Sequence, residues 1–175
     1  MAHGYMIESQ LTAHDISAYV KAAVAAADID GGTLVALGAH ANGKFTVTKA
    51  TSGAGLYIAK NPAQHLIKVG TKTVSGEDIS ADPRDFTNLA GENFNVEMLV
   101  PNVDVLKLTA GNIKTGETPA VGKYLEQGAD GYVVKDAPTA STTSLKILEI
   151  GTQAVPMGGI GHEDMTTYLC MVAQN

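Results

Sequence analysis

Residues 33–48 read TLVALGAHANGKFTVT, and this stretch decides the fold. Two runs of β-prone residues, 33–37 and 44–48, flank the pair Asn42-Gly43. An Asn-Gly pair between such runs supplies the positive φ angles that a tight hairpin turn requires. The stretch therefore predicts an antiparallel β-hairpin.

A second hairpin is predicted further along the chain. Residues 121–126 and 132–135 are β-prone, and Asp130-Gly131 between them marks the turn. Six more short strand candidates, separated by Gly and Asn turns, are residues 55–59, 65–69, 96–100, 103–108, 144–150 and 166–173. Many short strands with such turns predict a mainly β protein, either a small antiparallel β-barrel or a sandwich.

The chain is expected to consist of an arm and one domain. Its 175 residues suffice for one domain that buries its own core. Residues 1–15 carry an apolar content that is unusual for a free tail, so we expect an N-terminal arm that docks onto a partner. Residues 16–175 then form a single β-rich domain. Within it, residues 71–95 are rich in Gly, Asp, Asn, Ser and Thr and predict a long irregular loop.

Residues 15–28 leave two structures open. The alanines of this stretch favour one short helix, and Asp15 or Ser17 can cap its N-terminus. Val20 and Val24 suit an extended strand equally well. The sequence does not decide between helix and strand here.

Composition and charge exclude two classes of partner. The formal net charge is -6, and Arg84 is the one arginine, whereas nucleic-acid affinity comes largely from clustered Lys and Arg. The sequence has no run of about 18 apolar residues to span a bilayer, and its first residues lack the pattern of a signal peptide. We therefore expect neither a nucleic acid nor a membrane as partner.

The sequence contains no set of residues arranged to do chemistry. The glycine-rich stretches 52–55 and 158–161 are not followed by the Lys and the helix that a phosphate-binding loop needs. The five histidines are scattered without a His-x-His pair, and there is no Gly-x-Ser-x-Gly motif. Cys170 lies in an apolar run that is typical of a buried strand. We expect no enzyme activity, no cofactor, no metal and no small-molecule substrate.

Several segments, taken in order, carry a resemblance to a known family. They are a glycine turn that leads into a strand at 27–37, small-barrel segments at 104–108 and 118–125, and two strands at 145–150 and 168–172. In this order of features the chain resembles the capsid decoration proteins of tailed bacteriophages, also called auxiliary head or cement proteins.

The resemblance implies a non-enzymatic structural virion protein. Such a protein is made in the host cytoplasm, binds the outer surface of an icosahedral capsid and stabilises the head lattice against internal pressure. Its partners are then the lattice of the major capsid protein and further copies of itself. The aromatic content of 5% also favours a homo-oligomer, because a core with few large side chains leaves part of the stability to association.

We expect the contacts with the lattice to come from the arm and the long loop. The candidate partner-binding residues are Tyr5, Met6, Ile7 and Leu11 in the arm and Arg84 and Phe86 in the loop. The alternative function is a tail, baseplate or fibre-associated β domain for host recognition. Glycan sites of that kind usually present aromatic platforms, and the chain has three Phe and six Tyr.

Overall fold

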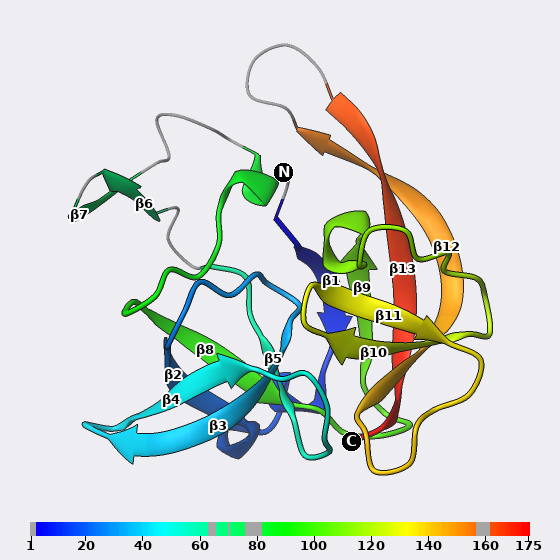
Figure 1. Cartoon of the computed structure of the whole chain (residues 1–175), viewed down its shortest axis with the longest axis horizontal. Helices are drawn as coiled ribbons and strands as arrows, with labels where there is room; N and C mark the ends of the chain where they lie inside the picture. Colours follow the sequence, from blue (N-terminus) through cyan, green and yellow to red (C-terminus); the bar gives the residue numbers. More distant parts are fainter. Residues whose placement is uncertain (1–2, 63–65, 70, 76–81, 157–161) are drawn as a thin grey trace.

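The computed structural model of the chain describes residues 3–62, 66–69, 71–75, 82–156 and 162–175. The protein is mainly β, as predicted. A closed five-stranded barrel lies beside a six-stranded antiparallel sheet, and a two-stranded ribbon stands apart from both (Figure 1).

The barrel contains the predicted hairpin at residues 33–48, which is confirmed as β3 and β4. The φ angles of its turn residues Asn42 and Gly43 are 51° and 77°. Around the barrel the strands follow the order β2 (Val20–Ala25), β4 (Lys44–Lys49), β3 (Leu34–Ala41), β5 (Tyr57–Ala59) and β8 (Asn93–Met98). β2 runs parallel to β4, and the other neighbours are antiparallel. The barrel is narrow, and its interior is filled mostly by small side chains, namely Ala23, Ala25, Ile29, Val35, Val47, Ala59, Phe94 and Val96.

The sheet contains the second predicted hairpin, which is confirmed as β10 and β11. Its strand order is β1 (Met6–Gln10), β9 (Val105–Thr109), β13 (His162–Gln174), β12 (Ser144–Pro156), β10 (Tyr124–Gly128) and β11 (Gly131–Lys135). β12 and β13 extend beyond the strands beside them. Within the ranges that the structure describes, β10 pairs only with residues 144–146 of β12, and β9 pairs only with residues 167–171 of β13. We call residues 152–156 and 162–166 the distal ribbon, which projects beyond the rest of the sheet (Figure 1).

The remaining elements are short. The two-stranded ribbon, called here the side ribbon, consists of β6 (Leu66–Val69) and β7 (Lys72–Ser75). The turns of 3-10 helix are η1 (Thr12–His14), η2 (Ser17–Tyr19), η3 (Pro83–Asp85) and η4 (Ala110–Asn112).

Residues 15–28 contain a strand rather than an α-helix. The single turn η2 leads into β2, whose backbone pairs with β4 and β8. Ala23 is 0% exposed and Ala25 is 2% exposed, and both point into the barrel. Pairing with two neighbouring strands therefore overrides the helix propensity of the alanines.

The first described residues pack into the domain instead of extending from it. β1 pairs with β9 at the edge of the sheet. Met6 and Leu11 lie in the core that the barrel and the sheet share. This segment differs from the expected arm because its apolar side chains find their partners within the same chain.

The expected loop at residues 71–95 is partly regular. Its described part contains β7, η3 and the first residues of β8. Residues 76–81 lie outside the described residues. Periodicity did not indicate β7, because a four-residue strand in a polar stretch has no distinctive pattern.

One hydrophobic core joins the barrel to the sheet. Leu34 and Ile58 enter it from the barrel, and Leu106, Leu108 and Cys170 enter it from the sheet. All five side chains are 0% exposed. The barrel and the sheet are therefore two parts of one packed unit.

Asparagine side chains complete the backbone hydrogen bonding along this seam. Asn61 accepts a bond from the amide of Met6 at 3.0 Å and donates one to the carbonyl of the same residue at 2.6 Å. Asn112 accepts from the amide of Tyr5 at 3.1 Å and donates to the carbonyl of Gly31 at 2.7 Å. These bonds satisfy main-chain groups that no strand pairs with.

Asp104 performs the same role with a carboxylate. One oxygen accepts bonds from the amide and the hydroxyl of Thr12 at 2.7 and 2.6 Å, and the other accepts from the amide of Val100 at 2.7 Å. Asp104 is 0% exposed, so water cannot replace it as an acceptor. The residue ties the N-terminal segment to the start of the turn before β9.

Replacing Asp104 by Ala is expected to lower the free energy of unfolding by about 3 kcal/mol, because it leaves buried donors unpaired. Urea denaturation measures this change. Asp164→Ala, which removes an exposed carboxylate of β13, is the matched control and is expected to have little effect. Equal losses in the two variants would contradict the role assigned to Asp104.

Candidate functional site

Half of the six predicted partner-binding residues are core residues. Met6 is 4% exposed, Leu11 is 3% exposed and Phe86 is 2% exposed. In this conformation their side chains have no surface to offer another protein. We therefore do not include them in a partner-binding surface.

Tyr5 and Ile7 are half-buried on or next to the edge strand β1. The amide of Tyr5 donates to the hydroxyl of Thr109 at 3.2 Å as well as to Asn112. Alternation along β1 places Ile7 on the opposite face from Met6. The structure does not gather the six predicted residues at one exposed place.

Arg84 was also expected to contact a partner, but its side chain forms ion pairs within the chain. Its guanidinium donates to both carboxylate oxygens of Asp82, with the shortest distance 2.6 Å, and to Glu163 of β13 at 2.8 Å. The side chain of Arg84 is 11% exposed. Arg84 thus connects η3 to the distal ribbon.

Arg84 also determines the protonation of its neighbour. The side-chain hydrogen bond from the guanidinium lowers the pKa of Asp82 from its ordinary value of 3.8, and desolvation opposes this shift only in part. Because the folded pKa is the lower one, the pair stabilises the fold above pH 3.8. This contribution is lost as the pH falls through the folded pKa.

The variant Arg84→Met is expected to lose about 2 kcal/mol of unfolding free energy at pH 7, since it removes charged hydrogen bonds at a largely buried site. The difference from the unsubstituted protein should shrink as the pH falls below 3.8, and it is lost as the pH passes through the folded pKa of Asp82. Urea denaturation of both proteins, at pH 7 and at an acidic pH below 3.8, measures this difference in unfolding free energy. Lys135→Met, at an exposed position of β11, is the control. If Arg84→Met loses the same unfolding free energy at neutral and at acidic pH, the result contradicts the pairing of Arg84 with Asp82.

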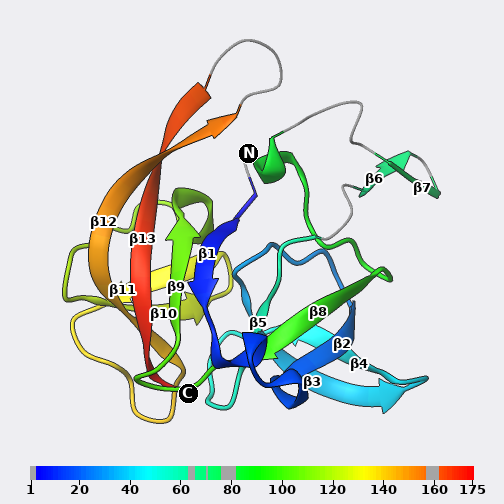
Figure 2. The same cartoon turned by 180° about the vertical axis from the view of Figure 1, so that it is seen from behind.

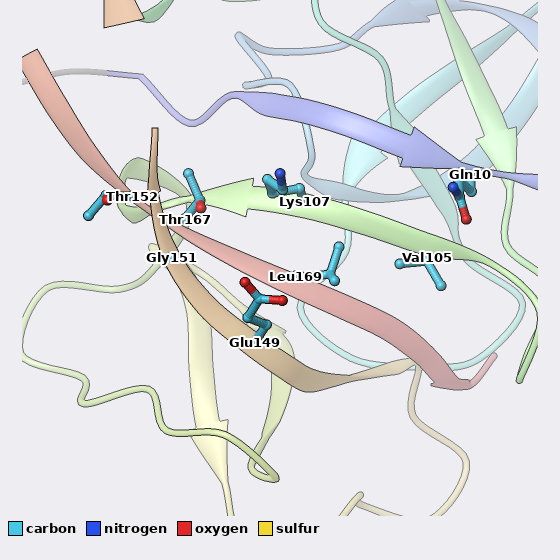
Figure 3. Close-up of a pocket in the computed structure, with 8 residues that line it drawn as sticks. All are labelled: Gln10, Val105, Lys107, Glu149, Gly151, Thr152, Thr167 and Leu169. Carbon is cyan, nitrogen blue, oxygen red and sulfur yellow. The ribbon is translucent and has the colours of Figure 1, made fainter. Parts of the chain in front are cut away.

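A groove of about 320 Å³ crosses the outer face of β1, β9, β13 and β12 (Figure 3). Lys107, Leu169 and Glu149 form a row across its middle, because each is the register partner of the next on three adjacent strands. The other lining residues are Gln10, Val105, Gly151, Thr152 and Thr167. The groove therefore combines two apolar side chains, Val105 and Leu169, with polar residues, one cationic side chain and one anionic side chain.

The groove does not contain a catalytic set. Its lining has two threonine hydroxyls, Lys107 and Glu149, and none of the eight residues is a His or Cys. Lys107 and Glu149 are two strands apart, too far for one to activate the other. In the described part of the chain, no group of three or more His, Cys, Asp and Glu side chains is placed to hold a metal ion. What the groove can do is bind a surface that has apolar and charged groups.

Cys170 is the chain's one thiol, and it is buried in β13 with 0% exposure. Burial raises the pKa of the thiol to about 12. The thiolate is the reactive form, so this residue is chemically inert in the folded protein.

We expect Cys170 not to react with an aromatic disulfide reagent at pH 8 while the protein is folded, and to react with one equivalent after unfolding. Absorbance of the released thiolate measures the reaction. Val103→Cys places a thiol at a position that is 60% exposed and serves as the reactive control. Labelling of native Cys170 at the rate of this control would refute the assignment.

The distal ribbon is an exposed element with a fixed position. Glu163 holds it to Arg84, and Met165, which is 6% exposed, packs at its base. Ala154 and Asp164 are cross-strand partners, and both are exposed. Among the described residues, β12 and β13 pair only with each other in this part.

The distal ribbon lies outside the segments predicted to contact a partner, whereas Gln10 of the groove lies within residues 1–15 and β7 within residues 71–95. Sequence reasoning identified β12 and β13 as strands but not their projection, which depends on how far their neighbours extend. It missed β7, although Gly70 between two β-prone runs is a hairpin signal. No helix in the described residues has the length and apolarity needed to cross a membrane.

Comparisons with family models, with curated proteins and with solved structures find no match to this chain.

Proposed function

We propose that the chain is a structural virion protein that binds the outer surface of an icosahedral phage capsid and stabilises the head lattice. The order of sequence features supports this proposal through its resemblance to capsid decoration proteins. Binding to a lattice needs a rigid scaffold and projecting contact elements, and it needs no residues with catalytic chemistry.

The observation that carries the proposal is the distal ribbon. It projects from a packed body, and the ion pair between Glu163 and Arg84 holds it near its far end, where Val155 is the partner of Glu163. Its strand edges pair with no other described strand and can offer main-chain groups to a partner. Addition of a strand to such an edge is a common way for proteins to bind one another. We therefore assign the capsid contact to the distal ribbon and the lattice of the major capsid protein as its partner.

The test mixes the pure protein with undecorated heads of its own phage and measures bound protein against free protein. We expect saturable binding. Ala154→Arg combined with Asp164→Arg should weaken it at least about tenfold, because two bulky charges then occupy the contact face.

The matched control is Val103→Arg combined with Val121→Arg, which places the same side chains at positions that are 60% and 62% exposed elsewhere. It should bind as the unsubstituted protein does. The proposal fails if heads show no saturable binding, or if the ribbon variant binds as well as the control. Binding to intact host cells instead of heads would point to a tail or fibre protein.

A further inference from the structure

The side ribbon exposes apolar side chains to solvent. Val69 is 60% exposed and Val74 is 39% exposed. In the described part of the chain, β6 and β7 pair with each other over four residue pairs and with no other strand. A two-stranded ribbon by itself is only marginally stable in water. Covering its valines with another surface would therefore stabilise it.

One face of the side ribbon carries both valines and a lysine. Lys72 is the cross-strand partner of Val69, and Val74 follows Lys72 by two residues along β7. Cross-strand partners share a face, and so do residues two apart in a strand, so these three side chains lie on the same face. Lys72 is exposed, like the rest of β7.

The charge of this region differs in sign from that of the chain. Residues 31–76 contain five lysines and none of the 18 Asp and Glu residues, whereas the net charge of the whole chain is -6. The side ribbon lies within this acid-free segment. A complementary surface for it is therefore apolar with an exposed carboxylate.

The groove of Figure 3 is such a surface. Val105 and Leu169 supply apolar area, and the exposed Glu149 of β12 supplies the carboxylate. Gly151 adds no side chain and leaves that wall open. Lys107 lies two strands from Glu149, at about 10 Å. A lysine of a docking partner that approaches β12 is therefore closer to the carboxylate of Glu149 than to the ammonium group of Lys107.

The side ribbon and β12 lie at opposite ends of the molecule in both views (Figures 1 and 2). They cannot meet within one chain. We propose that the side ribbon of one copy docks into the groove of a second copy, with Lys72 beside Glu149 and the ribbon valines against Val105 and Leu169. The contact joins two different surfaces, so repeated copies form a ring or an open chain.

This inference goes beyond the capsid proposal, because self-association is measured without heads. Light scattering across a range of protein concentrations should give a mass above the 18.1 kDa of one chain, and added salt should lower it. Lys72→Glu and Glu149→Lys should each weaken self-association by about tenfold, since each places like charges in contact.

The double variant, Lys72→Glu with Glu149→Lys, restores opposite charges across the contact between copies. It should return self-association to within about threefold of the unsubstituted protein. Lys114→Glu makes the same charge change at an exposed lysine outside the side ribbon and should leave the mass unchanged. Circular dichroism verifies that every variant is folded.

Two results would overturn the proposal. One is a mass of a single chain for the unsubstituted protein at all concentrations and salt levels. The other is a double variant that associates as weakly as the single ones, because a contact between Lys72 and Glu149 requires the exchange to compensate.

Discussion

Barrel strands and sheet strands belong to separate hydrogen-bonded units, yet they share one hydrophobic core, so backbone groups at their seam need side-chain partners. Asn112 and Asp104, which are buried, and Asn61, which is half-buried, provide them. A buried amide or carbonyl without a partner costs free energy comparable to a lost hydrogen bond. The relative position of the barrel and the sheet therefore depends on a few polar side chains as well as on apolar area.

The N-terminal segment is the part of the chain most affected by this constraint. From the sequence, its apolar residues are expected to contact a partner. In the structure, Met6 and Leu11 pack into the core between the barrel and the sheet. Asn61, Asp104 and Asn112 are far from this segment in the sequence and bind its backbone. Because these first residues pack into the core, the exposed elements of the chain include the distal ribbon and the side ribbon.

In the two proposals, the distal ribbon contacts the capsid lattice and the side ribbon contacts another copy of the chain. The distal ribbon belongs to the sheet and is held near its far end by the ion pair between Glu163 and Arg84, which suits contact with a regular lattice. The side ribbon has an exposed apolar and cationic face, and the groove at the other end of the molecule complements it. A protein that coats a lattice gains from both kinds of contact, because links between copies add to the binding of each copy.

Local sequence determined the elements whose physical cause is local. Asn42-Gly43 specifies its hairpin because both residues adopt the positive φ angles of the turn without strain. The second hairpin turns at Ala129 and Asp130, and Gly131 is the partner of Gly128 in the ladder. The apolar run around Cys170 specifies a buried strand. Tertiary structure decided the rest. Residues 20–25 became a strand because two distant strands pair with them, and Arg84 became internal because Glu163 reaches it from β13. Pairing and burial over such separations depend on partners that no local pattern of residues identifies.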